Sequence, residues 1–205
     1  VDGQPITEFC RERALDLRAR IELVIEVAEA IASAHRQLVL HGDIKPANVL
    51  VTSRGQVKLL DFGIARLLNE SAHAGEDDAA WQAMTPAFAS PEQSQGQPLT
   101  AASDIFQLGR LLQRLCEGMA AGRGRLRALD AIASKALSQQ PSSRYRSAEA
   151  LADDLRALLA HRPVLALGGG WAYRVACLLR RRWFALSLGL VLSTLGAAML
   201  HVQLE

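Results

Sequence analysis

The sequence contains the stretch His41-Gly42-Asp43-Ile44-Lys45-Pro46-Ala47-Asn48-Val49-Leu50, followed by Asp61-Phe62-Gly63. These two short segments carry two carboxylates, one ammonium group and one carboxamide. Asp43 can accept a proton, and Lys45 can neutralise the charge that develops on a phosphoryl group during its transfer. Asn48 and Asp61 offer oxygen atoms, which are the ligands that magnesium prefers. The order and spacing of these groups indicate phosphate and magnesium chemistry.

Two short apolar runs connect these segments. Residues 49–51 and 57–60 flank the turn-forming residues 52–56, in which Gly55 can adopt a positive φ. We therefore predict a β-hairpin that brings Asn48 and Asp61 together although they are distant in the sequence. Residues 38–40 are predicted to form a short strand that leads into the first segment.

With Ser90-Pro91-Glu92-Gln93 downstream, these segments resemble the catalytic loop and the magnesium-binding Asp-Phe-Gly of protein kinases. The sequences of these segments are most similar to those of bacterial receptor-type serine/threonine kinases, and the resemblance extends from Val1 to about Pro163. It implies a mainly α fold with short β-hairpins, namely the C-terminal lobe of a kinase. It also implies ATP and Mg²⁺ as cofactors, with Mn²⁺ as the alternative cation, and a protein substrate with Ser or Thr.

The N-terminal β lobe of the family, with its glycine-rich loop and ATP-binding lysine, is expected to be missing from this chain. Those parts normally form half of the nucleotide site. Their absence counts against activity of the chain by itself.

The resemblance assigns roles to the residues that match the family motifs. Asp43 would accept the proton of the substrate hydroxyl, Lys45 would lie beside the transferring phosphoryl group, and the Thr85 hydroxyl would bond to both. Adenine would be held by the end of the hinge, and magnesium by the two oxygen-bearing side chains of the loops. The implied set is Asp43, Lys45, Asn48 and Thr85 for catalysis, Val1, Asp2, Lys45, Asn48 and Asp61 for ATP, and Asn48 and Asp61 for the metal.

Two further residues are expected to support the catalytic loop. His41 would pack beneath Asp61 and Phe62 rather than carry a proton. Asp104 matches the aspartate near the start of the family's central helix that hydrogen-bonds the backbone of the catalytic loop. A helix N-cap formed by Ser103 or Asp104 is the simpler interpretation, and the two are compatible.

A buried ion pair is also implied by the resemblance. Arg144 would bind Glu92 through two parallel hydrogen bonds, because a planar guanidinium matches the geometry of a carboxylate. This pair would be a structural clamp.

Gly42 departs from the usual His-Arg-Asp of the family. The missing arginine would ordinarily bind a phosphate on the activation segment, which the resemblance places before residue 92. Ser71 and Thr85 can be phosphorylated, but no arginine at position 42 would bind the phosphate. We therefore do not expect activity to depend strongly on phosphorylation of this segment.

Apolar residues that recur at intervals of three and four predict helices over about 18–37, 104–115, 126–138 and 148–161. The glycine-containing run 117–124 is expected to break the second of these from the third. Kinases normally carry a longer excursion there, which includes a substrate-docking helix. Its loss puts the usual peptide-binding surface in question.

The composition of the chain limits the classes of protein to which it can belong. A chain of 205 residues that is 50% hydrophobic can hold one domain with a core and a smaller appendage. The net charge of +2 gives no reason to expect nucleic-acid binding. The three cysteines and five histidines follow neither a disulfide framework nor a metal-ligand spacing, which argues against zinc and favours a reducing compartment.

The C-terminal part predicts a membrane anchor. We expect the kinase lobe over 1–162, a linker and basic juxtamembrane segment over 163–182, a transmembrane helix over 183–200 and a truncated tail over 201–205. The 18 uncharged residues would extend about 27 Å as a helix, close to the thickness of a bilayer core. The arginines at 180–182 place the lobe on the cytoplasmic side of a single-pass inner-membrane protein. A soluble core helix is the alternative.

A stripe of small residues within this predicted span could seat a second copy of the helix and form a homodimer. The stripe consists of Gly189, Ser193 and Ala197.

Three functions remain open from the sequence. The chain could be part of a membrane-anchored serine/threonine kinase, a membrane-tethered pseudokinase that acts as an interaction module, or a degraded gene product. The retained motif residues favour the first, and the missing lobe and docking helix favour the other two.

Overall fold

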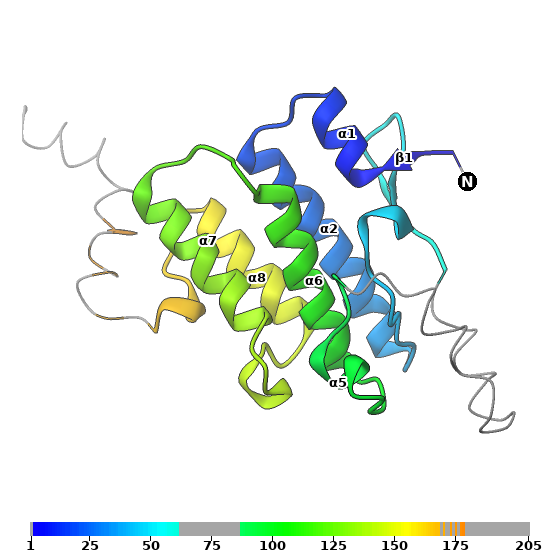
Figure 1. The fold of residues 1–205 in the computed structure, drawn as a ribbon. Coiled ribbons are helices and arrows are strands. Elements are labelled where there is room, and N and C mark those ends of the chain that lie inside the picture. Colours follow the sequence, from blue (N-terminus) through cyan, green and yellow to red (C-terminus); the bar gives the residue numbers. More distant parts are fainter. Residues whose placement is uncertain are drawn as a thin grey trace, which may run out of the picture.

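The computed structural model describes residues 2–61 and 87–168, together with positions 170, 173, 175, 177 and 178. This part of the chain is mainly helical, with one small sheet on the side of the helical body where the N-terminus lies (Figure 1). The predicted mainly α fold with a short hairpin is therefore confirmed. Within the described residues, no helix is both long and apolar enough to cross a membrane. The predicted span over 183–200 lies outside the described residues.

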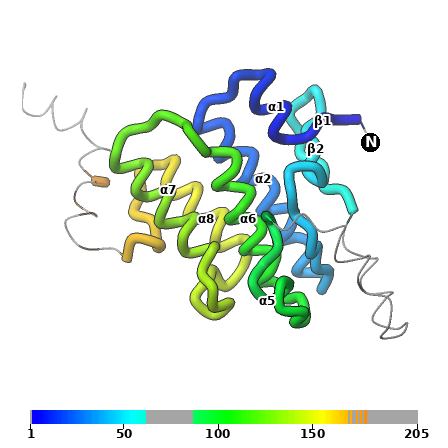
Figure 2. The backbone as a smooth tube through the Cα atoms, viewed as in Figure 1, coloured from blue at the N-terminus to red at the C-terminus, as the bar shows by residue number. Residues whose placement is uncertain are grey.

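Four long helices form the core. They are α2 (Leu17–Arg36), α6 (Ala101–Cys116), α7 (Arg123–Ala136) and α8 (Ala148–Leu159). Helix α6 packs between α2 and α7, and α8 packs against α2 and α7 (Figures 1 and 2). The leucines of α6 that face its neighbours are fully buried, which makes α6 the centre of the hydrophobic core.

Local signals explain where these helices begin. The Asp16 side chain accepts a hydrogen bond from the Ala19 N–H at 2.8 Å, and Ser147 caps α8 in the same way. The cap predicted for α6 at Ser103 or Asp104 is wrong, because the helix begins one turn earlier and its N-cap is Thr100. The Thr100 N–H donates to the Ser103 Oγ at 3.2 Å.

The sheet has the strand order β1-β2-β3 and is antiparallel throughout. Its strands are β1 (Gln4–Pro5), β2 (Val49–Val51) and β3 (Val57–Leu59). Val49 pairs with Leu59 and Val51 pairs with Val57, so the predicted hairpin is confirmed. Gly55 has φ +83° in its turn, as expected for a residue with no Cβ.

Short elements complete the described part of the chain. They are α1 (Ile6–Glu12), α5 (Pro91–Ser94) and the 3₁₀ turns η1 (Pro46–Asn48), η2 (Pro141–Ser143) and η3 (Leu165–Leu167). Helix α1 was not predicted. It forms because Ile6, Phe9 and Cys10 lie on one face and are buried against the core.

The strand predicted over 38–40 is wrong. The N–H groups of Leu38 and Val39 donate to the carbonyls of His35 and Ala34, both at 3.0 Å, and this closes the C-terminus of α2. Leu38 adopts a positive φ of 60° and its side chain is 93% exposed. These donors are therefore used by the helix end and are not available to a sheet.

The start of the predicted linker packs onto α8. Val164 is buried, and the Asp154 carboxylate accepts from the N–H groups of Leu165 and Ala166 at 2.5 and 3.0 Å. The same carboxylate accepts from the Tyr145 hydroxyl at 2.7 Å. Residues 164–167 are thus held to the lobe by a buried acidic group of α8.

The predicted pair of Arg144 and Glu92 ties α5 to the end of α7. Arg144 Nη1 and Nη2 donate to Glu92 Oε1 and Oε2 at 2.7 and 2.8 Å. The remaining N–H groups of the guanidinium donate to backbone carbonyls, including Ser138 O at 2.8 Å and Ala102 O at 2.7 Å. Both side chains are buried, so each charge is compensated where water is excluded.

We predict that Arg144→Met will lower the free energy of unfolding by roughly 3–5 kcal/mol, because it leaves the Glu92 carboxylate buried without its partner. Urea unfolding followed by circular dichroism measures this change. Arg146→Met is the matched control, since Arg146 is exposed two residues away. A loss of the same size in both variants would contradict a buried clamp.

The pair also predicts a dependence of stability on pH. Burial by itself raises the pKa of Glu92. Hydrogen bonds from Arg144, the backbone and Ser103, together with the Arg144 charge, outweigh burial and lower this pKa from 4.5 to about 2. The stabilisation is therefore present above about pH 4.5 and is lost as the pH falls towards 2.

Urea midpoints measured between pH 6 and pH 2 test this expectation. The decline should be shallower in Glu92→Gln, which lacks the titrating group. Parallel curves for the two proteins would show that Glu92 is not the source of the decline.

Candidate active site

Asp43, Lys45 and Asn48 meet on the loop between α2 and β2. Lys45 Nζ lies 2.8 Å from Asp43 Oδ2, and Asn48 Nδ2 donates to Asp43 Oδ2 and to the Asp43 carbonyl, both at 2.9 Å. The Asp43 side chain is 34% exposed, whereas that of Lys45 is 17% exposed. The carboxylate is thus oriented by two donors and still reachable from outside. This arrangement can accept a proton next to a fixed positive charge.

The hairpin places Asp61 close to this group. The Leu60 N–H donates to the Asn48 carbonyl at 2.9 Å, so the residue after Leu60 emerges beside Asn48. Asp61 is exposed and has a positive φ of 51°. Asn48 uses its amide nitrogen on Asp43, which leaves its Oδ1 as the atom able to face a cation. An amide oxygen and an exposed carboxylate are a donor set that fits Mg²⁺, which binds few protein oxygens and retains waters.

Asp104 holds the start of the loop through its backbone. Its Oδ2 accepts from the His41 N–H at 3.0 Å, and its Oδ1 accepts from the Gly42 N–H at 2.7 Å. His35 Nε2 lies 2.7 Å from Asp104 Oδ2 and links α2 to the same carboxylate. Hydrogen bonds to a carboxylate are stronger than neutral ones, and these are shielded from water. The loop therefore begins from a rigid anchor on α6.

His41 is completely buried beneath the loop. Its Nδ1 accepts from the Asp43 N–H at 3.3 Å. Burial lowers the pKa of His41 below its ordinary 6.5 and outweighs the charges of Asp104 and Asp43, which raise it. A neutral, buried imidazole that supports the Asp43 backbone agrees with a structural role. Its expected packing against Phe62 involves a residue outside the described part.

The sequence alone did not assign a role to Gln93 or Gln107. Both are buried, and Nε2 of each donates to the Gly42 carbonyl at 2.8 Å. A signal was present, because Ser103, Asp104 and Gln107 are polar residues among the apolar residues that α6 buries. The contact of His35 with Asp104 is likewise not predicted from the sequence.

Gly42 occupies a position with little room for a side chain. Its φ is +75°, a left-handed conformation that favours glycine. A Cβ added there would lie 2.7 Å from Leu99 Cδ1. Leu99 therefore fills the space into which a larger residue would project.

The remaining residues expected at the site from the sequence are Val1, Asp2 and Thr85. Val1 and Thr85 lie outside the described residues, as do Phe62 and Gly63. Asp2 is exposed and lies two residues before β1, whose Pro5 pairs with Leu50 of the central strand. The structure thus brings Asp43, Lys45 and Asn48 into contact and places Asp61 next to them.

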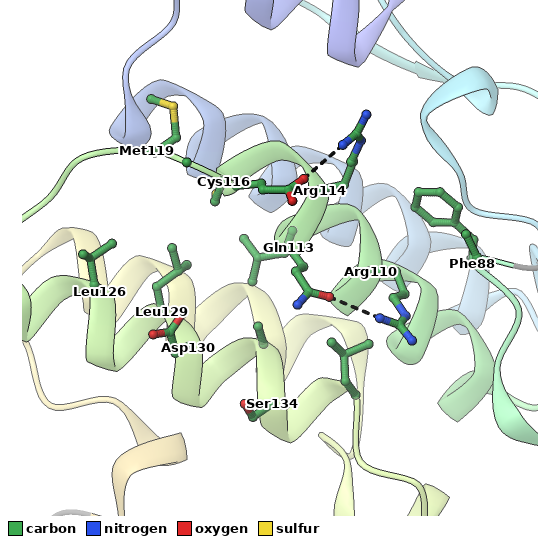
Figure 3. A pocket seen from close by; sticks show the side chains of 16 residues that line it. Phe88, Arg110, Gln113, Arg114, Cys116, Met119, Leu126, Leu129, Asp130 and Ser134 are labelled. Atoms are coloured by element: carbon green, nitrogen blue, oxygen red, sulfur yellow. Dashed lines mark hydrogen bonds and ion pairs between the residues drawn. The ribbon is translucent and has the colours of Figure 1, made fainter.

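A groove of about 1010 Å³ lies elsewhere, between α6 and α7 (Figure 3). No catalytic-loop residue lines it. Its wall combines apolar and charged side chains, including Met119, Leu126, Leu129, Arg110 and Asp130. The run 117–124 was expected to break the chain between helices, but α7 already begins at Arg123, so that Gly124 is helical.

Comparison with known proteins agrees with this geometry. The chain is 34% identical to a probable serine/threonine-protein kinase of Streptomyces coelicolor, over 84% of this chain and 30% of that protein. It is 29% identical to the serine/threonine-protein kinase PknB of Mycobacterium tuberculosis, over 76% of this chain and 29% of that protein. A probable PknB of Corynebacterium glutamicum is 31% identical, over 65% of this chain and 25% of that protein.

The chain thus spans less than a third of the length of these curated relatives. Residues 1–151 match the protein kinase domain family, which is nearly three quarters of the sequence. This match includes the loop with Asp43, Lys45 and Asn48, the Asp61 segment, and the anchors on α5 and α6. The chain belongs to the protein kinase domain family.

Proposed function

We propose that this chain carries the phosphoryl-transfer residues of a serine/threonine protein kinase. The reaction would move the γ-phosphoryl group of ATP to the hydroxyl of a Ser or Thr in a protein substrate. The observation that carries the proposal is the contact of the Asp43 carboxylate with Lys45 Nζ at 2.8 Å and with Asn48 Nδ2 at 2.9 Å. The names of the curated relatives support the same reaction class.

Asp43 would act as the general base. A hydroxyl hydrogen-bonded to its carboxylate would lose its proton to Asp43 as the new bond from oxygen to phosphorus forms and the bond to the β-phosphate oxygen breaks. Lys45 Nζ lies next to this carboxylate, where its charge would stabilise negative charge on the transferring group. Asn48 orients the Asp43 carboxylate from the other side.

Asn48 and Asp61 would hold Mg²⁺, or Mn²⁺ as the alternative. The bound cation supplies neutralisation of the phosphate charges of ATP. The donor set supports this assignment, because both side chains offer hard oxygen ligands and the hairpin keeps their backbones together. Val1 and Asp2 are the proposed hinge contacts of adenine, on the basis of the family resemblance.

An interaction module without catalysis is the second candidate. The groove between α6 and α7 favours it, because an open surface lined by apolar and charged side chains suits a protein partner. In this alternative the loop would be retained for its structural contacts. A comparison of phosphoryl transfer by the chain and by an Asp43 variant separates the two candidates.

We further propose that residues 183–200 anchor the lobe in the inner membrane, with the lobe in the cytoplasm. The support is the uncharged run preceded by the arginines at 180–182. Pairing of two such segments through Gly189, Ser193 and Ala197 would give a homodimer. These assignments rest on the sequence.

We predict that Asp43→Asn will reduce phosphoryl transfer from labelled ATP to a Ser/Thr acceptor protein by at least about a hundredfold, because the base is lost while the shape is kept. Transfer to casein in the presence of Mg²⁺ measures this. Asp153→Asn is the control, since Asp153 is exposed on α8 and remote from the loop. Equal background in the wild-type chain and Asp43→Asn would exclude catalysis by this chain alone and favour the interaction module.

We predict that Asp61→Asn will weaken binding of Mn²⁺ in the presence of ATP by about tenfold or more, because a carboxylate ligand is replaced by a neutral amide. Electron paramagnetic resonance of free Mn²⁺ measures the affinity independently of turnover. Asp153→Asn should leave the affinity unchanged. The same affinity in Asp61→Asn and wild type would remove Asp61 from the metal site.

A further inference from the structure

A pair of buried carboxamides holds the catalytic loop at one carbonyl group. Gln93 Nε2 and Gln107 Nε2 both donate to the Gly42 oxygen at 2.8 Å, from α5 and from α6. Gln107 Oε1 accepts from the Ile44 N–H at 2.7 Å. Asp43 lies between these two backbone contacts. The residue that would act as base therefore has fixed peptide groups on both sides.

The two carboxamides also fix each other. Gln107 Nε2 donates to Gln93 Oε1 at 2.9 Å, and the same oxygen accepts from the Ser90 N–H at 2.9 Å and from Ser90 Oγ at 3.0 Å. Turning over either amide would set donors against donors in a buried space. Each side chain thus has a single favourable orientation. We call this group, Ser90, Gln93 and Gln107, the carboxamide relay.

The relay connects the end of the activation segment to the catalytic loop. In the family, an arginine of the loop and a phosphate on that segment make this connection through their charges. Ser90 and Gln93 stand where the activation segment ends, and Gly42 stands where the family has the arginine that binds a phosphate on that segment. Position 42 has no side chain, and Leu99 Cδ1 lies 2.7 Å from where its Cβ would be. The hydrogen bond that joins residues 90–93 to the loop, from Gln93 Nε2 to the Gly42 oxygen, is neutral and buried.

We propose that Gln93 and Gln107 are positioning residues for Asp43, and that the relay replaces the link between phosphate and arginine as the connection between the end of the activation segment and the catalytic loop. This inference rests on the proposed function. In this proposal the uncharged hydrogen bonds of the relay, rather than a phosphate, control the position of Asp43. Disturbance of Ser90 or Gln93 would then loosen the loop through Gly42.

Amide hydrogen exchange of the full chain, followed by mass spectrometry, tests the relay without requiring turnover. In Gln107→Leu, exchange in peptides covering residues 41–46 should rise by about tenfold, because two contacts to the loop backbone are lost. Gln93→Leu should raise exchange both there and in residues 88–94. Gln113→Leu is the control on the same helix, since Gln113 is exposed. Exchange in α2 and α8 should be unchanged in all three.

Gln107→Glu separates positioning from simple packing. Its ionised carboxylate keeps the shape and can accept from the Ile44 N–H, but it cannot donate to the Gly42 oxygen. Exchange in residues 41–46, relative to wild type at the same pH, should therefore be raised at pH 7 and should fall towards wild type as the carboxyl group gains a proton. A ratio of one at every pH in a folded Gln107→Glu, or equal exchange in Gln107→Leu and Gln113→Leu, would overturn the relay.

Activity provides a separate readout. If the wild-type chain transfers phosphate, Gln107→Leu should lower kcat with little change in KM for ATP, and phosphatase treatment should leave the wild-type rate nearly unchanged. A large loss of rate after phosphatase treatment would overturn the replacement of phosphate control by the relay. If the wild-type chain transfers none, the proposed function fails, while the exchange ratios still decide whether the relay holds the loop.

Discussion

The polar face of α6 is the constraint on which the site depends. Asp104 accepts from the N–H groups of His41 and Gly42, and Gln107 binds the Gly42 carbonyl and the Ile44 N–H. A buried helix with such groups is stable only when each of them finds a partner. The loop backbone supplies these partners. The need to satisfy α6 and the need to hold the loop are therefore met by the same hydrogen bonds.

The same face also reaches the clamp on α5. Ser103 Oγ donates to Glu92 Oε1 at 2.8 Å, and Glu92 is in turn bound by Arg144. One turn of α6 thus contacts the catalytic loop, α5 and the link between α7 and α8. Because these contacts exclude water and share partners, a change at one of them is expected to affect the others more than separate effects would.

The chemistry of the loop follows from this rigidity. The Asp43 carboxylate is partly exposed, but its backbone is fixed on both sides and its side chain is oriented by Lys45 and Asn48. A catalytic base that is already held in its reactive orientation is more effective, because the entropy cost of orienting it does not add to the barrier of the reaction. The groove between α6 and α7 is a separate feature of the same helix pair.

The order of residues by itself determined the helices at the core and the hairpin. These follow from apolar periodicity and turn residues, which act over a few neighbours. It also indicated the residues of the loop and the pairing of Glu92 with Arg144, through resemblance to the family. Local pattern failed at Leu38, where the end of α2 uses the donors of a predicted strand, and at the cap of α6, which lies at Thr100.

Only the tertiary structure decided that Gln93, Gln107 and His35 converge on the loop and on its anchor. Their partners are between 51 and 69 residues away in the sequence. The residues next to an uncharged polar side chain on a helix do not indicate whether that side chain makes a buried hydrogen bond or faces solvent. The fit of Leu99 against Gly42 has the same origin. Such contacts depend on how helices pack, and packing is set by the whole core rather than by any single segment.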